Sequence, residues 1–366
     1  MEILKYDLFL LFIPKKWFSG VLSALLTLHA LQWFADTSVV GQVVREKSGE
    51  KAMLNIRSFV KGADEPIWVG VLNAAWKEYE VWWRSITVEE MREQEKRPNF
   101  DFEGRFIAEL EGKPVGIIHA RVDKFRKEKK GFVHVFCVIP EFRGLGVEEG
   151  LLEFGMNELK RRRMSLVQAW TDHSRNERIQ VLEKAGFRLV DVESDMEIAL
   201  EKIPSKIGED TQVIIRSLRK NDERDIKVLN RLANECFKEH FDYHPRTIEE
   251  TRDSLLNDLY LKIQECFFAT LDKKNVGFIR VGIDEKYNIE RDVKRGRIAS
   301  LGVLKPYRRR GIGTRLTLHG LEALKAKGMT KAILDVDDFN PTKAIELYEK
   351  VGFKVAKKYM KYEREL

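Results

Sequence analysis

Cysteine is scarce in this sequence of 366 residues: its three cysteines lie far apart and form no Cys-x-x-Cys pair. An odd number of isolated cysteines argues against a disulfide framework and against a thiolate zinc site. We therefore expect no bound metal and a reducing, cytoplasmic compartment. Long runs of one charge sign are also lacking, because 65 basic and 58 acidic residues are mixed along the chain and leave a net charge of +7. This balance suits an anionic ligand, and we expect no nucleic acid partner.

Long hydrophobic runs are nearly absent as well. One stretch, residues 17–34, is about as long as a membrane-spanning helix, but polar residues dilute it. Three interpretations of residues 1–52 stay open: translation that begins at Met53, a membrane anchor that keeps the rest of the chain on the cytoplasmic side, and an extra packed helix. In each of them we expect this N-terminal hydrophobic extension to lie outside the folded domains, the first of which starts at Met53.

The rest of the sequence contains an internal repeat. Four segments of the first half recur in the second half in the same order and with similar spacing, and one such pair is IQVLEKAGFRLV at 179–190 and IELYEKVGFKVA at 345–356. Each half has the size of a normal domain, so the repeat predicts two similar structural units. We expect the first domain at 53–201, a polar linker at 202–211 and the second domain at 212–366.

The periodicity within each half predicts an α+β fold. Two short apolar or alternating runs around a turn indicate a β-hairpin at 106–122 and another at 267–283. A buried strand, a glycine-rich turn and a helix follow, and in the second half this helix should run from Thr314 to Gly328. A last helix is expected over residues 341–350. The predicted architecture is two tandem units, each with a mixed, mostly antiparallel sheet flanked by helices.

The glycine-rich turn of the second half carries the clearest chemical signal. It reads Arg308-Arg309-Arg310-Gly311-Ile312-Gly313-Thr314 and lies between a buried strand and a helix N-terminus. Unpaired backbone N–H groups and the helix dipole attract a phosphate at such a position. The glycines allow close approach to the backbone, and the arginines supply positive charge and forked donors. The turn therefore predicts a pyrophosphate site.

This turn resembles the R/Q-x-x-G-x-G/A signature of the GNAT superfamily of acetyl-CoA-dependent N-acetyltransferases. A second family signature is an Asn followed by a helix that carries a Tyr and closes with Gly-Phe, and it is matched by Asn340, Tyr348 and Gly352-Phe353. The resemblance covers both halves, from about residue 53 to the C-terminus. Mycothiol synthase, a tandem member of this family, has a similar two-domain arrangement.

The resemblance implies transfer of an acetyl group from acetyl-CoA to a primary amine, that of a small molecule or a free amino group. Tyr348 would protonate the leaving CoA thiolate, and Asp242 or His244 in a polar loop would accept the proton of the amine. A backbone N–H near Val303 would stabilise the oxyanion. The residues implied in cofactor binding are Leu301, Val303, Arg308, Arg309, Arg310, Gly311, Ile312, Gly313, Thr314 and Asn340.

The first half departs from both signatures. Glu148 stands at the position of Gly313, where a carboxylate would repel a pyrophosphate. Leu182 replaces Tyr348 and Ser174 replaces Asn340. We expect this half to be degenerate, to bind acetyl-CoA weakly or not at all, and to act as a structural partner.

Several alternatives stay open at this stage. The protein would present an open peptide groove if it acetylated protein N-termini or lysines. It would bind CoA without turnover if it were a sensor. The identity of the acceptor amine, the preferred acyl chain and the formation of a homodimer are not fixed by the sequence.

Overall fold

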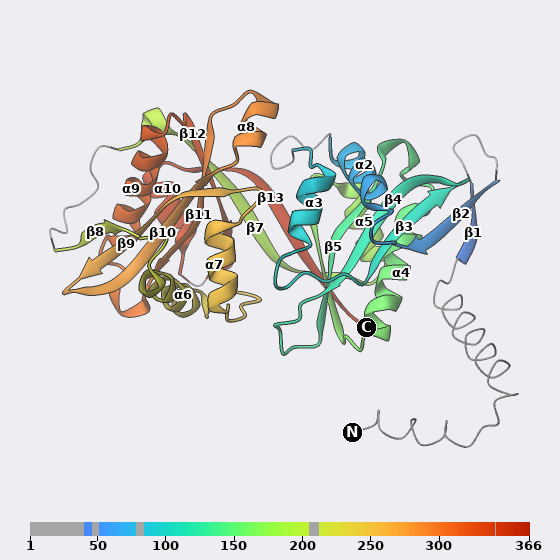
Figure 1. Ribbon diagram of the computed structural model, residues 1–366, viewed down its shortest axis with the longest axis horizontal. Coiled ribbons are helices and arrows are strands. Elements are labelled where there is room, and N and C mark those ends of the chain that lie inside the picture. Colours follow the sequence, from blue (N-terminus) through green and yellow to red (C-terminus); the bar gives the residue numbers. More distant parts are fainter. Residues whose placement is uncertain (1–39, 46–50, 78–83, 205–211, 341) are drawn as a thin grey trace, which may run out of the picture.

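The computed structural model describes residues 40–45, 51–77, 84–204, 212–340 and 342–366. Within these ranges no helix is long and apolar enough to cross a membrane, and the candidate segment 17–34 lies outside them. The strands of the described residues form one 13-stranded sheet that runs through both halves (Figure 1). The mixed sheet with helices on its faces confirms the predicted α+β class.

The first half contributes seven strands and four helices to the described part of the chain. Its strands are β1 Val40–Arg45, β2 Lys51–Ser58, β3 Arg105–Leu110, β4 Lys113–Val122, β5 Lys130–Val138, β6 Leu166–Asp172 and β7 Arg188–Ala199. Its helices are α2 Glu65–Trp76, α3 Val88–Gln94, α4 Val147–Arg161 and α5 Asn176–Lys184. β1 pairs with β2, with Val40 opposite Ile56, so residues 40–45 of the expected N-terminal extension form the edge strand of the sheet.

The second half repeats this order of elements from β2 onward, with one additional helix. Its strands are β8 Ile214–Ser217, β9 Lys262–Leu271, β10 Lys274–Ile283, β11 Arg295–Val303, β12 Lys331–Asp337 and β13 Lys354–Glu365. Its helices are α6 Glu223–Phe237, α7 Ile248–Leu256, α8 Glu285–Arg291, α9 Ile312–Ala326 and α10 Ala344–Val351. The two predicted hairpins are present as β3–β4 and β9–β10.

The two halves exchange their last strands. β7 leaves the first half and pairs with β12 of the second half, while β13 inserts between β6 and β7. Both strands are 12 residues long and cross the centre of the molecule in Figure 1. Backbone hydrogen bonds therefore join the two halves into one sheet, and a strand of the first half completes the sheet of the second.

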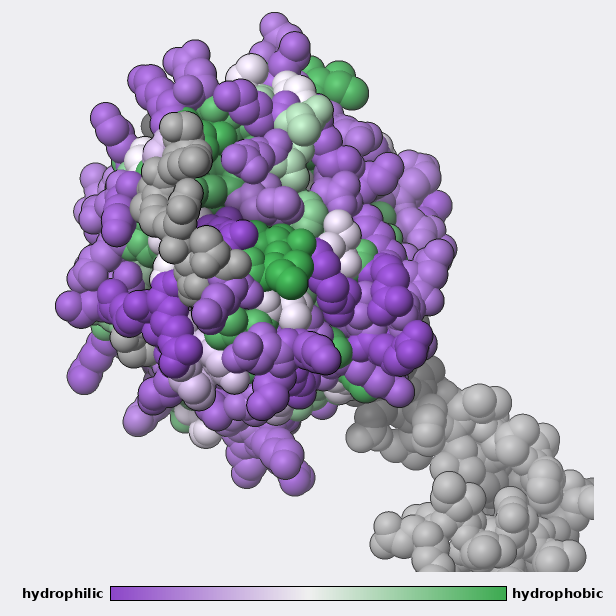
Figure 2. All heavy atoms as spheres, turned by 90° about the vertical axis from the view of Figure 1, so that its left-hand side faces the viewer, coloured by the Kyte–Doolittle hydropathy of each residue, from purple (hydrophilic) through white to green (hydrophobic). Residues whose placement is uncertain are grey.

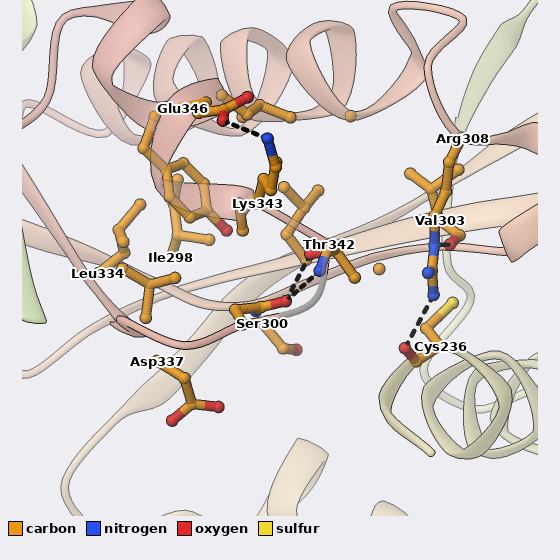
Figure 3. A pocket seen from close by; sticks show the side chains of 18 of the residues that line it. Cys236, Ile298, Ser300, Val303, Arg308, Leu334, Asp337, Thr342, Lys343 and Glu346 are labelled. Atoms are coloured by element: carbon orange, nitrogen blue, oxygen red, sulfur yellow. Dashed lines mark hydrogen bonds and ion pairs between the residues drawn. The ribbon is translucent and has the colours of Figure 1, made fainter. Parts of the chain in front are cut away.

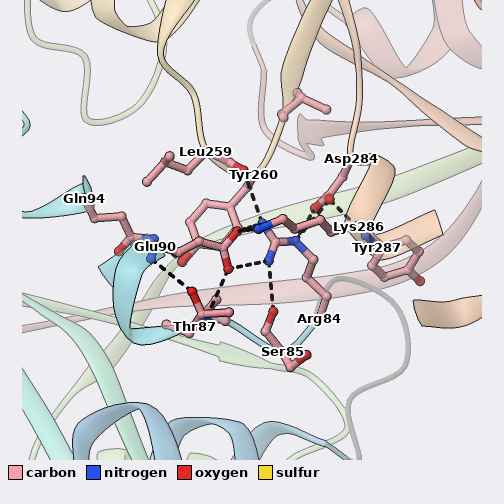
Figure 4. Close-up of polar contacts among 12 residues, drawn as sticks. Arg84, Ser85, Thr87, Glu90, Gln94, Leu259, Tyr260, Asp284, Lys286 and Tyr287 are labelled. Atoms are coloured by element: carbon pink, nitrogen blue, oxygen red, sulfur yellow. Dashed lines mark hydrogen bonds and ion pairs between the residues drawn. The ribbon is translucent and has the colours of Figure 1, made fainter. Parts of the chain in front are cut away.

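A polar cluster also joins the halves. The Arg84 side chain, 2% exposed, contacts Glu90 of α3 at 2.9 Å and Asp284, which precedes α8, at 3.1 Å. Lys286 of α8 also contacts Glu90, at 2.6 Å (Figure 4). Elsewhere the outer face of the second half is mostly hydrophilic, with small hydrophobic patches (Figure 2).

The core of the second half lies on both faces of its sheet. α9 and α10 cover one face, where Leu316, Leu321 and Tyr348 are buried. α6 and α7 cover the other face, around Phe268 and Phe278. This division matters for the site, because residues on the two faces approach a ligand in the sheet from opposite sides.

The sheet opens at the same place in each half. β11 pairs with β12 only over Arg295–Arg297, and the two strands separate beyond this point. At the point of separation Ala299 is an extra residue, because Arg280 of β10 lies opposite Ser300 and Val281 lies opposite Ile298. His134 of β5 forms the equivalent bulge in the first half. Such bulges interrupt the backbone ladder and are common beside active sites.

Candidate active site

A cavity of about 620 Å³ occupies the space between the separated ends of β11 and β12 (Figure 3). Its walls come from β11, the glycine-rich turn, the end of β12, α10 and the C-terminal end of α6, with one residue, Glu193, from β7. The predicted cofactor residues that line it are Leu301, Val303, Arg308, Arg309, Gly311, Gly313, Thr314 and Asn340. Arg310 and Ile312 are not among its lining residues, and Ile312 is buried in the core.

The glycine-rich turn forms the N-terminus of α9 as expected. Gly311 precedes the helix with a φ of +76°, a conformation that a residue with a side chain adopts only at a cost. The Arg315 N–H donates to the Gly311 carbonyl at 3.0 Å, so the N–H groups of residues 312–314 precede the first intrahelical bond. A Cβ at Gly313 would lie 2.8 Å from Leu347 Cδ1, so α10 packs closely against this turn. The helix end can hold an anion.

Arg308 and Arg309 of the turn differ in what they contact. Arg308 donates through Nε to the Val303 carbonyl at 3.0 Å and pairs with Glu239 at 3.0 Å. Its Nη2 also donates to the Cys236 carbonyl at 3.3 Å (Figure 3). The Arg308 guanidinium therefore ties the end of β11 to the end of α6. Arg309 lies 3.8 Å from Glu346, and both side chains are more than half exposed.

Tyr348 lies at the cavity wall on α10, where it is 6% exposed and packs edge-on against Phe353. Burial raises the pKa of its hydroxyl above the ordinary value, and the negative charge of Asp335 adds to this shift. The hydroxyl is therefore protonated at neutral pH and can donate. Asn340 shapes the turn before α10, because its Oδ1 accepts hydrogen bonds from the Thr342 N–H at 2.8 Å and hydroxyl at 2.6 Å.

Glu193 of β7 lines the same cavity, although it belongs to the first half. Burial raises the pKa of its carboxyl to about 8, and Asp335 adds to the shift while Lys361 opposes it. Lys361 Nζ lies 3.2 Å from Glu193 and 2.7 Å from Asp337, which also lines the cavity. Although burial acts in the other direction, hydrogen bonds from His240 and Lys361 lower the pKa of Asp337 to about 2. Of these two cavity carboxyls, Glu193 is thus the one that can change protonation near neutral pH.

Comparison with known proteins identifies the family. A profile of the acetyltransferase (GNAT) family matches residues 68–187 and 227–353, about two thirds of the chain. The chain belongs to the GNAT acetyltransferase family. Because each half is matched separately, it is a tandem GNAT protein, as the repeat predicts.

Individual GNAT relatives share a smaller part of the sequence. A mycothiol acetyltransferase of Streptomyces griseus subsp. griseus is 28% identical over 140 residues, which cover 38% of this chain and 45% of that protein. The chain thus spans less than half the length of this curated relative. The crystal structure of a GCN5-related N-acetyltransferase from Sphaerobacter thermophilus has a TM-score of 0.62 at 21% identity and covers 85% of this chain and 95% of that one. A tandem GNAT protein from the clavulanic acid biosynthesis pathway has a TM-score of 0.63 at 13% identity, with coverages of 85% and 98%. The two structures share the fold.

Asp242 and His244, the bases suggested by the sequence, do not line the cavity of this GNAT protein. Asp242 pairs with Arg126 at 2.8 Å and with Lys130 at 2.7 Å, both in the first half. His244 Nε2 lies 3.7 Å from Asp123 Oδ2, also in the first half. The structure therefore places both residues at the contact between the halves and not beside Tyr348. Among the described residues no cluster of His, Cys, Asp and Glu side chains is arranged to hold a metal ion.

The two GNAT halves enclose a second cavity of about 830 Å³ between them. Its walls come from α2, α3, β4 and β5 of the first half and from α7, β10 and β11 of the second. The bulge residue Ala299 lines this cavity and the one that holds Tyr348. The two cavities therefore meet at the bulge of β11, on the face of the sheet that carries α6 and α7.

In the corresponding groove of the first GNAT half, a side chain of α5 contacts β5. Arg178 of α5 donates to the Phe136 carbonyl, and its guanidinium stacks 4.7 Å from the Phe136 ring. Burial lowers the pKa of Arg178 to about 10, and Glu148 opposes this shift. The repeat places Ala344 at the equivalent position of the second half, where it lines the open cavity. Alignment of the two repeats therefore shows the difference between Arg178 and Ala344, although the two family signatures do not include this position.

Proposed function

We propose that this protein transfers an acetyl group from acetyl-CoA to a primary amine of a small molecule, at one active site in the second half. One observation carries the proposal: a buried tyrosine and a carboxyl with a raised pKa, Tyr348 and Glu193, line a single cavity that ends at a helix N-terminus. The tyrosine is provided by the face of α9 and α10, and the carboxyl by a strand of the first half.

The cavity suits the cofactor in charge and shape. The N–H groups of residues 312–314 at the start of α9 would hold the pyrophosphate. The separated part of β11, which includes Leu301 and Val303, would offer backbone groups to the amides of the pantetheine arm. The bulge at Ala299 breaks the ladder to β10 and would leave a backbone group for the thioester carbonyl. We prefer this position for the oxyanion because Val303 lies at the opposite end of the cavity, beside Arg308.

The reaction follows from the placement of the two groups. The amine nitrogen attacks the thioester carbon and forms the new C–N bond, and Glu193 takes the proton that the nitrogen loses. The C–S bond breaks, and the Tyr348 hydroxyl donates its proton to the leaving sulfur. With a pKa near 8 the Glu193 carboxylate is a stronger base than an ordinary glutamate, which suits deprotonation of an amine.

The acceptor would reach the thioester from the cavity between the halves, since that cavity meets the cofactor cavity at Ala299. Both halves contribute walls to this space, and we propose a small molecule as the acceptor. The three cysteines are free and buried, as expected for a protein of a reducing compartment, and we propose a cytoplasmic location.

The first half would not bind the cofactor. The Arg178 guanidinium occupies the groove, and Glu148 places a buried carboxyl at the helix N-terminus where the pyrophosphate would lie. This half instead contributes β7 and one wall of the acceptor cavity.

Calorimetric titration of acetyl-CoA into the full chain tests the proposal. We expect one site, no binding to Gly313→Glu, and no second site in Glu148→Gly, because Arg178 still fills the first groove. Gly313→Ala is the matched control, since it introduces the contact with Leu347 without the charge. Thiol release from acetyl-CoA in the presence of a panel of amines then measures turnover. Two sites in the parent chain, or unchanged binding to Gly313→Glu, would refute the assignment.

A further inference from the structure

Several buried side-chain nitrogens of residues that line the cavity between the halves have no hydrogen-bond partner among the described residues. They include Nε of Arg280, Nε of Arg105 and Nε2 of His119. These three residues are 8%, 3% and 4% exposed, so water replaces few of the missing contacts. An unpartnered buried donor costs free energy, because the group has lost its hydration without gaining a hydrogen bond.

Three of the six carboxylates that line this cavity are engaged by close partners. Asp101 pairs with Arg162 at 2.7 Å, Asp284 pairs with Arg84 at 3.1 Å, and Asp123 accepts a hydrogen bond from Asn99 at 2.7 Å. Arg280 differs, because no carboxylate of the described residues pairs with it. Its Nη2 donates to the Ser254 carbonyl at 2.7 Å, which leaves the positive charge without a counter-ion. The charge still to be neutralised in this cavity is positive.

Arg280 lies beside the reacting centre. It stands on β10 opposite Ser300, directly next to the bulge at Ala299 where the two cavities meet. His119 holds the equivalent place on β4, opposite Val135 and next to the bulge at His134. Matching positions of the two halves therefore place a buried arginine and a buried histidine in the wall of the same cavity. Burial lowers the pKa of Arg280, as expected for a cation that lacks a partner.

We infer that the acceptor amine carries a carboxylate or phosphate group, which Arg280 binds in the cavity between the halves while the amine points to Ala299. This inference rests on the proposed function and names its substrate class. An oxyanion would give the Arg280 guanidinium the counter-ion that no carboxylate of the described residues provides. A neutral amine of the same shape would leave the charge of Arg280 unpaired.

Matched pairs of amines test this inference. β-Alanine is compared with propylamine for the carboxylate, and glucosamine 6-phosphate with glucosamine for the phosphate. Binding is measured by calorimetry with the full chain saturated with CoA, so that no reaction occurs, and turnover is measured separately by thiol release from acetyl-CoA. We expect the anionic member of at least one pair to bind about 10- to 100-fold more tightly, the range of a charge-assisted hydrogen bond.

Substitution of the arginine identifies its role. Arg280→Gln should abolish the preference for the anionic amine and leave the affinity for acetyl-CoA unchanged. Arg224→Gln removes the same charge from a side chain that is 84% exposed and should keep the preference. Equal affinity for both members of each pair, or no binding of any of the four amines, would overturn the inference even without a variant. Binding of an anionic amine without thiol release would instead count against the proposed transferase activity and leave the anion site intact.

Discussion

Replacement of Glu193 by glutamine is the sharpest test of the proposed base. Glutamine keeps the size of the side chain and removes the proton acceptor. A carboxyl with a pKa near 8 is about one-tenth ionised at pH 7, so its ionisation alone should raise kcat/KM of the parent protein about tenfold between pH 7 and pH 9, on top of the rise from deprotonation of the amine. Glu193 interacts with Lys361 and Asp335, so this inflection belongs to the group of charges and not to one isolated carboxyl.

The variant should lose turnover and the inflection together. Removal of a general base lowers rates by about 10²- to 10⁴-fold, and the remaining activity should follow only the ionisation of the amine. The assay is the initial rate of thiol release at pH 6 to 10 with saturating acetyl-CoA. Two acceptors are needed, an α-amine with a pKa near ~8 and an alkylamine with a pKa near ~10.4. An inflection that stays near pH 8 with both acceptors belongs to the protein.

Asp195 provides the matched control for Glu193. It lies two residues further along β7, and burial together with the charge of Asp335 raises its pKa to about 8 as well. Asp195 does not line the cavity that holds Tyr348. Asp195→Asn should therefore keep the inflection and most of the turnover. If Glu193→Gln retains both properties, or if Asp195→Asn alone loses them, Glu193 is not the base.

Two further substitutions test the acid and the junction of the halves. Tyr348→Phe should lower turnover by about 10²-fold or more and leave acetyl-CoA affinity nearly unchanged, measured by thiol release and calorimetry; unchanged turnover would remove Tyr348 from the mechanism. Arg84→Met should lower the free energy of unfolding by about 3–5 kcal/mol in a urea titration, because it leaves Glu90 buried with less compensation and breaks the pair with Asp284. Lys96→Met, which removes an exposed ion pair, should change it by less than about 1 kcal/mol, and equal effects of the two variants would contradict this account.

The sequence was most informative where structure is local. The hairpins and the helix after the glycine turn follow from short-range periodicity and turn residues, and all are present. The last helix begins at Ala344 and not at residue 341. Asn340 holds a hydrogen-bonded turn with Thr342, and Lys343 has a φ of +56°, so the helix cannot start earlier.

Glu193, the base that we propose, could not be selected from the sequence because its place in the cavity depends on contacts between the halves. Asp242 lies in the loop that the family resemblance indicates, but it forms ion pairs with Arg126 and Lys130 of the first half at the junction. Glu193 lies about 155 residues before Tyr348 and reaches it only because β7 crosses into the other half. The alternating acidic pattern is equally typical of the solvated face of a strand, here formed by Asp191, Glu193 and Asp195.

The exchange of strands explains how a half without an open cofactor groove can still take part in the chemistry. β7 brings Glu193 to the cavity, and it also covers the edge of β12, which would otherwise expose a row of unpaired backbone groups. β6 of the first half in turn holds β13. Under the proposed function, the second half alone would lack Glu193 as its base, one neighbour of β12 and the first-half wall of the acceptor cavity. The contact of Arg178 with Phe136 in the first half changes none of these three contributions.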